Sequence, residues 1–207
     1  TAFLFDAVQP EGGEMPVVMA PGASGILMHE AIGHAFEADF NRVGTSIFAG
    51  KMGQRVCRPE VTIVDDGTQA EDVGCLRWDD EGIPGQRTVL VDKGVLNSYM
   101  HDRISARHYG VEPTGNGRRE SFRHAPQPRM RSTYMMAGES NPEDIIRSVK
   151  KGIYAQVFTN GQVQIGAGDF TFYMKQGYLI EDGHLTQPIR DINVIGNGPR
   201  ALADISM

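Results

Sequence analysis

The sequence is poor in cysteine, has no long hydrophobic run and has no excess of basic residues. Its 207 residues include only two cysteines, Cys57 and Cys75, without a C-x-x-C spacing. This argues against a disulfide framework and against a zinc finger, and favours reduced thiols. No apolar stretch approaches the roughly 20 residues that span a bilayer, and the N-terminus lacks the pattern of a signal peptide. We therefore expect no membrane association and a cytoplasmic location.

The charge balance is acidic, with 20 lysines and arginines against 26 aspartates and glutamates and a net charge of −6. Proteins that bind nucleic acid by neutralising phosphates are usually basic, so we expect no direct contact with nucleic acid. Hydrophobic residues make up 40% of the chain, and its 25 glycines occur without a collagen period. This composition is typical of a globular protein with many tight turns, and the length suits one large domain or two small ones.

Alternating apolar residues and turn dipeptides predict that antiparallel strands dominate the fold. We expect a hairpin over 87–100 and a meander over 152–189, with its first turn at Asn160-Gly161. Capping signals predict short helices over 103–109 and 142–151. The regular strand–helix alternation of a parallel sheet is absent. The predicted fold class is α+β, mainly an antiparallel β-sheet with a meander or barrel-like form, a distorted metal-binding helix and a few short helices.

A long segment without a regular pattern, 111–133, concentrates arginine. Loops of this length in a compact domain are usually functional or mobile. The arginines could bind a peptide carboxylate or carbonyl group, or they could offset the acidic remainder of the chain. The sequence leaves both interpretations open. The residues concerned are Arg118, Arg119, Arg123, Arg129 and Arg131.

The chemistry of the sequence is concentrated in one segment, HEAIGH, at residues 29–34. Imidazoles are the usual nitrogen ligands of zinc, and a glutamate next to the first of them can act as the general base for a metal-bound water. His29 and His34 are therefore the candidate zinc ligands. Glu30 is the candidate catalytic residue.

The spacing of the two histidines requires a distorted helix. Apolar periodicity predicts a helix over 24–39 with Ser24 as its N-cap. Residues i and i+5 of a regular α-helix point about 140° apart, whereas a π-turn brings them back to about 50°. Because glycine gives way most easily, Gly33 is the natural place for the change. We therefore predict a π-bulge or kink at Ile32–His34.

Two other interpretations of this helix remain open on spacing alone. Glu30, His34 and Glu37 lie at i, i+4 and i+7, so they could form a solvated polar stripe. The same stripe could instead bind a metal through carboxylate and imidazole, with His29 elsewhere. Among the other histidines, His124 is the best candidate for a third ligand. The remainder are more consistent with surface or hydrogen-bonding roles: His101, His108 and His184.

Four longer segments resemble a single family over nearly the whole chain. They are APGASGILMHEAIGHAFEAD (20–39), GNGRRESFRHAPQPRM (115–130), QVQIGAGDFTF (162–172) and IGNGPRALADISM (195–207). Their sequences and their order are similar to those of the TldD/PmbA family, whose members were once called modulators of DNA gyrase.

The resemblance implies a zinc metallopeptidase that acts in the bacterial or archaeal cytoplasm on unfolded peptides or small labile proteins. It also implies a PmbA/TldE-like sister subunit that lacks the motif, or a homodimer, as the assembly. By position, His29 and His34 match the metal ligands of the family, and Glu30 matches its catalytic glutamate. The alternative is a non-catalytic interaction module, as the older family name suggests.

The resemblance further implies that residues 1–207 form a single, strand-rich C-terminal catalytic domain. An N-terminal domain and the extreme C-terminus are expected outside this sequence. The third protein ligand of the family is a cysteine that follows the segment ending at Met207, and neither Cys57 nor Cys75 matches it. With two protein ligands instead of three, a fragment is expected to bind zinc weakly.

Overall fold

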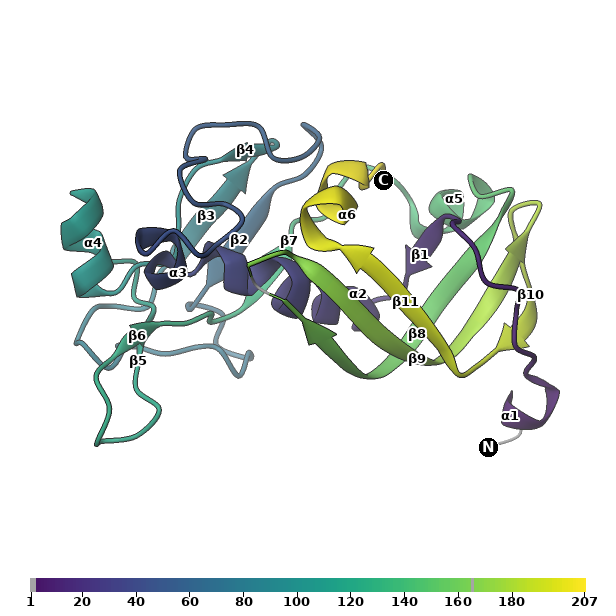
Figure 1. Ribbon diagram of the computed structural model, residues 1–207, viewed down its shortest axis with the longest axis horizontal. Helices are drawn as coiled ribbons and strands as arrows, with labels where there is room; N and C mark the ends of the chain where they lie inside the picture. The colour runs from purple at the N-terminus through teal and green to yellow at the C-terminus, as the bar shows by residue number, and fades with distance from the viewer. Residues whose placement is uncertain (1–2, 165) are drawn as a thin grey trace.

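The computed structural model describes residues 3–164 and 166–207, which form two groups of strands beside a central helical segment (Figure 1). The larger sheet contains the long strands of the second half of the chain, and the smaller sheet is built mainly from residues 63–135. The fold is α+β with mainly antiparallel pairing, as the sequence predicted. In the part of the chain described, no helix is long and apolar enough to cross a membrane.

The larger sheet has the order β1-β8-β9-β10, and β11 also pairs with β9. One edge of strand β9 pairs with two other strands. The first half of β9 pairs with β11, and its second half pairs with β10. Every pair is antiparallel except that β1 runs parallel to β8. The described strands form open sheets, so the barrel-like form is not observed. The strands are β1 (Val17–Met19), β8 (Lys151–Val163), β9 (Asp169–Glu181), β10 (His184–Ile189) and β11 (Ile192–Asn197).

The predicted turn at Asn160-Gly161 is wrong, because both residues lie inside β8. Gly161 is paired with Phe172 of β9, and a Cβ atom at this glycine would lie 2.1 Å from the Phe172 ring. The glycine therefore provides room for a buried aromatic side chain instead of reversing the chain. The connection to β9 comes later and includes Gly168, whose φ is +80°.

The smaller sheet has the antiparallel order β4-β3-β2-β7, and a separate two-stranded ribbon pairs β5 with β6. The predicted hairpin is confirmed, although its second strand is short and ends at Leu96. The ribbon lies within the arginine-containing segment 111–133. The strands are β2 (Ile63–Asp66), β3 (Arg87–Asp92), β4 (Val95–Leu96), β5 (Gly117–Arg118), β6 (Gln127–Pro128) and β7 (Thr133–Met135).

Short helices connect the strands. The helix predicted over 103–109 is confirmed as α4 (Arg103–Tyr109), capped by the Asp102 side chain. Helix α5 (Pro142–Arg147) has the expected Asn141 cap but ends earlier than residue 151. It ends early because Lys151, the predicted last residue, already lies in β8, where it pairs with Glu181 of β9. The two terminal helices are α1 (Phe3–Asp6) and α6 (Gly198–Asp204).

The central helical segment forms much of the core. Its π-helical part, η1 (Leu27–Ile32), contacts β7 of the smaller sheet, β8 of the larger sheet and α6. Ile32 and Phe36 are fully buried, and the Phe36 ring stacks on Phe48 with 4.7 Å between centroids. Burying each such side chain contributes about 1.5–3 kcal/mol. The apolar side of the segment is therefore firmly held, which fixes the positions of the polar side chains on its other side.

Candidate metal centre

The segment that carries the HEAIGH motif is a distorted helix, as the histidine spacing predicted. It passes from α2 (Ala23–Ile26) through the π-helix η1 into the 3-10 helix η2 (Gly33–Phe36). Glu37 is extended, and α3 (Ala38–Arg42) follows it. The distortion is thus longer than predicted, because its π-turns begin at Leu27, and the predicted Ile32–His34 lies where they end. The helix changes from π to 3-10 geometry at Gly33.

The predicted start and end of this helix are both wrong. Ser24 lies inside the first turn, where its N–H donates to the Ala20 carbonyl, and the N-cap position is occupied by Gly22 with φ +87°. At the other end, the extended backbone of Glu37 interrupts the helix two residues before Asp39. The interruption is stabilised from outside because Ala38 N–H donates to the Met100 carbonyl at 3.0 Å.

Gly33 stands at a crowded point of the backbone. Its N–H donates to the carbonyls of both His29 and Met28, which is the mixed bonding of a helix between α and π geometry. A Cβ atom at Gly33 would lie 2.7 Å from the Met28 carbonyl oxygen and 2.3 Å from the Met130 sulfur. The methionine end could move, but the backbone oxygen belongs to the π-turn itself.

We expect Gly33→Ala to destabilise the fold by about 1–3 kcal/mol, the usual cost of overpacking a tight site. Gly25→Ala is the matched control, because Gly25 is an exposed helical glycine with nothing within 4 Å of its added Cβ. That control is expected to be neutral or up to about 1 kcal/mol more stable. Urea unfolding of the metal-free protein measures both, and equal stabilities for the two variants would contradict the crowding argument.

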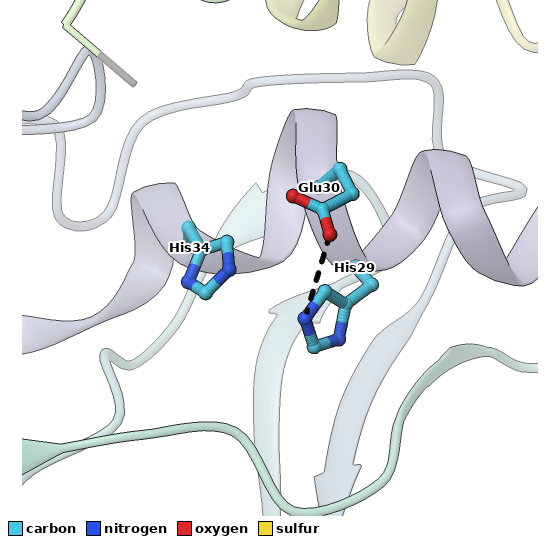
Figure 2. A group of neighbouring side chains, drawn as sticks. All are labelled: His29, Glu30 and His34. Carbon is cyan, nitrogen blue, oxygen red and sulfur yellow. Dashed lines mark ion pairs between the residues drawn. The ribbon is translucent and has the colours of Figure 1, made fainter. Parts of the chain in front are cut away.

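The π-turn brings the two histidines together with the glutamate between them in sequence. One ligand atom from each of His29, Glu30 and His34 lies within 4.8 Å of the others, and Figure 2 shows the three side chains gathered beside the helix ribbon. The imidazole centroids are 4.9 Å apart with the rings nearly perpendicular, at 81°. The Glu30 Oε1 atom is 4.0 Å from His29 Nε2. Across residues 3–164 and 166–207, this is the one cluster of three or more potential metal ligands.

Exposure differs among the three side chains. His29 and Glu30 are about half exposed, whereas the His34 side chain is 24% exposed. Solvent can therefore reach Glu30. The arrangement also decides against the solvated stripe, because Glu37 is completely buried, and against a position of His29 away from the other two residues.

An ion-pair network behind His34 was not predicted from the sequence. His34 Nδ1 lies 3.2 Å from Glu37 Oε2, and Arg129 Nη1 lies 3.3 Å from the same oxygen. The hydrogen bond to Glu37 raises the pKa of His34, and partial burial of the ring opposes this shift. Arg129 also contacts Asp39 Oδ2 at 3.2 Å. The i, i+3 spacing of His34 and Glu37 was a usable signal, but nothing local points to Arg129.

The other histidines lie outside the cluster. His124 is exposed, and its Nδ1 is 2.9 Å from the Ser121 hydroxyl, so it is not brought to the two motif histidines. His101 is buried, and desolvation lowers its pKa to about 4. Its ring packs against Tyr99 and Tyr109, which is a core position.

The two cysteines also lie outside the cluster. Cys57 is buried, and desolvation raises its pKa to about 11, which disfavours the thiolate that a metal requires. Cys75 is partly exposed in a loop between β2 and β3.

Most of the arginines in the segment 111–133 form hydrogen bonds with other residues of the chain. Arg131 donates from its side chain to the carbonyls of Gly115 and Gly117, both at 3.1 Å. Arg119 donates to the His124 carbonyl at 2.8 Å. Together with Arg129, these residues have structural partners, which favours an internal role for much of the segment over direct binding of substrate.

Two clustered imidazoles and a partly exposed carboxylate on a distorted helix are donor groups of the kind that bind a divalent metal. Comparison with known proteins identifies the family. Residues 12–207 match the family model described as the PmbA/TldA metallopeptidase C-terminal domain, and the chain belongs to the PmbA/TldD family.

Individual proteins similar to this chain support the family assignment. The metalloprotease TldD homolog of Haemophilus influenzae is 51% identical over 97% of this chain and 42% of its own length. The zinc metalloprotease TldD homolog of Saccharolobus solfataricus is 33% identical over 96% of this chain and 44% of its own length. The crystal structure of TldE from Thermococcus kodakarensis superposes with a TM-score of 0.86 at 25% identity, over 99% of this chain and 46% of that one. The chain thus spans less than half the length of these relatives.

Proposed function

We propose that this chain is the catalytic domain of a zinc-dependent peptidase that hydrolyses peptide bonds in unfolded peptides or small labile proteins in the cytoplasm. The observation that carries the proposal is the convergence of His29, Glu30 and His34 ligand atoms within 4.8 Å on one π-distorted helix. The name of the Saccharolobus relative, a zinc metalloprotease, supports the choice of metal.

The donor set fits zinc. Two imidazole nitrogens and a nearby carboxylate are common around this ion, and a catalytic zinc usually has three protein ligands and an open position. We propose that His29 and His34 supply two of these ligands and that the third comes from outside the described residues. Zinc, when bound, supplies Lewis acidity to the scissile carbonyl and to a water molecule.

Glu30 is proposed to move the proton. Its carboxylate stands 4.0 Å from His29 Nε2 and is 43% exposed, so it can contact both a water and the scissile bond. It would accept the proton of the attacking water and pass it to the leaving amine nitrogen. The carboxylate lies on the same side of the helix as the two imidazoles, with one atom of each within 4.8 Å of the others.

Strand β7 is the proposed place for an extended substrate. It is the edge strand of the smaller sheet, and it packs against η1, which carries His29 and Glu30. A peptide added to such an edge is held by main-chain hydrogen bonds, which gives little sequence preference. We further propose a PmbA/TldE-like subunit or a second copy of the chain as the assembly partner, supported by the fold shared with TldE.

Metal removal tests the proposal. The complete protein should contain about one zinc ion per site, and chelation should abolish peptide hydrolysis because the carbonyl is no longer polarised. Addition of Zn²⁺ should restore hydrolysis. Zinc content by mass spectrometry and cleavage of an unstructured peptide are the two measurements. Hydrolysis that persists in metal-free protein would contradict the proposal, and absence of stoichiometric metal would favour the non-catalytic interaction module.

A further inference from the structure

A buried carboxylate lies directly behind His34. The Glu37 side chain is 1% exposed, and its Oε2 atom is 3.2 Å from His34 Nδ1 and 3.3 Å from Arg129 Nη1. A carboxylate in this position accepts the Nδ1–H of the imidazole. The lone pair of the neutral ring is then on Nε2, which becomes the nitrogen available to a metal.

The backbone of Glu37 is fixed independently of its side chain. The buried Asn41 side chain donates from Nδ2 to the carbonyls of Glu37 and Ala35, each at 2.8 Å. The flanking residues join the strand-like segment at Met100, through Met100 N–H to the Phe36 carbonyl at 2.9 Å. The backbone of Glu37 is therefore held in place at the break in the helix.

The Arg129 side chain is also restrained by contacts other than the one that it makes with Glu37. Its Nη1 donates to the Pro128 carbonyl at 2.6 Å and to Asp39 Oδ2 at 3.2 Å, while Nη2 donates to Gln127 Oε1 at 2.6 Å. The guanidinium also lies over the Phe40 ring, 5.8 Å from its centroid. An arginine restrained in this way loses little further freedom when it pairs with Glu37.

Burying this network costs more folding free energy than a purely structural role would explain. The second carboxylate oxygen, Glu37 Oε1, is buried and has no hydrogen-bond partner within the described part of the chain. Unsatisfied buried oxygens are rare in native structures, and apolar side chains of similar volume often stabilise a fold as well as a buried ion pair does. The arrangement is better explained by the orientation that it imposes on His34.

We propose that Glu37, locked by Arg129, is a positioning residue that fixes the tautomer and ring orientation of His34 so that Nε2 is presented to the metal. The proposal rests on the function proposed above, since it takes His34 as a ligand. Partners of this kind behind metal-binding histidines typically change metal affinity by 10–100-fold when removed. Glu37 itself does not contact substrate or metal in this assignment.

The test uses Co²⁺ as the probe, titrated into the complete metal-free protein and followed by its visible absorption. Glu37→Ala should weaken Co²⁺ binding about 10–100-fold. Glu37→Gln keeps the shape and an acceptor oxygen, so its loss should be intermediate. Glu143→Gln is the matched control, because Glu143 is an exposed glutamate that also pairs with an arginine, Arg147, at 3.1 Å. It should leave Co²⁺ affinity unchanged.

A second readout separates positioning from folding. Nitrogen-15 shifts of His34 in the metal-free protein should show the Nδ1–H tautomer in the parent and a mixture of tautomers in Glu37→Ala, because the hydrogen bond of one nitrogen selects the form. Thermal unfolding of the metal-free variants identifies any that misfold. Should Glu37→Ala fail to fold, Glu37→Gln decides the question.

The outcomes also separate this inference from the function on which it rests. If His34→Ala abolishes Co²⁺ binding while folded Glu37 variants bind within twofold of the parent and keep one tautomer, the positioning role is wrong and the metal site stands. If His34→Ala binds Co²⁺ as well as the parent, the proposed site itself is wrong.

Discussion

Replacing Glu30 by glutamine in the complete protein is expected to lower peptide hydrolysis by about 10²–10⁴-fold while zinc stays bound. Glutamine has the shape of glutamate but cannot accept a proton at neutral pH, so the variant removes the general base and little else. The side chain is 43% exposed, so the change should not disturb the core. Initial rates on an unstructured peptide and zinc content per chain are the measurements.

Glu143→Gln provides the control for this prediction, since it removes one exposed carboxylate on α5 and should leave the rate unchanged. Two results would count against the assignment. Undiminished hydrolysis by Glu30→Gln with full zinc content would exclude Glu30 as the general base. Loss of zinc together with activity would instead make Glu30 a ligand.

His29→Ala and His34→Ala are each expected to weaken zinc binding by roughly a hundredfold or more. Zinc sites of four ligands bind with about 10–16 kcal/mol, so one ligand accounts for about 3 kcal/mol, or roughly a hundredfold in affinity. The two rings are 4.9 Å apart, so the effects should be similar if both bind one ion. Competition with a chromophoric chelator measures the affinity.

His124→Ala is the control, because this exposed histidine lies outside the cluster and should not change the affinity. A result in which only one of the two motif variants loses zinc would contradict a site shared by His29 and His34. In that case the ring that can be removed without loss is a neighbour of the metal and not a ligand.

The histidine spacing predicted a distorted helix on the condition that both rings bind one metal, because residues five apart point away from each other on a regular α-helix. It could not give the extent of the distortion, which depends on tertiary contacts. The π-turns fall over Leu27–Ile32, where η1 packs against β7, β8 and α6, and Gly33 ends them under Met130. Met130 is far along the chain, so no local pattern reveals that contact.

Turn and cap signals were right where they acted locally and wrong where packing overruled them. Asn141 caps its helix through its side chain, as its residue type predicted. Asn160-Gly161 has the composition of a hairpin turn but lies within β8, since Gly161 makes room for Phe172. Ser24 likewise looks like an N-cap, but Gly22 already bends the chain before it.

The residues of the candidate site also fall into two groups, those that local sequence predicts and those that depend on a distant partner. His29, Glu30 and His34 are close in sequence and could be chosen from chemistry alone. Glu37 was visible only as part of a polar stripe, whereas the structure buries it against an arginine 92 residues away. The burial of a charged side chain depends on a partner from another segment, and a single sequence does not show which arginine that is.

The π-helical segment is equivalent to one residue inserted into an α-helix. Without it, the histidines would stand four apart, and the chain after them would be turned back by about 100°. The insertion lets α2 pack on β8 while the residues after His34 join the segment at Met100, beside the smaller sheet. His29 and His34 therefore lie on either side of the change from π to 3-10 geometry at Gly33. A cation held by both rings would fasten the two parts of the helical segment to each other across this change.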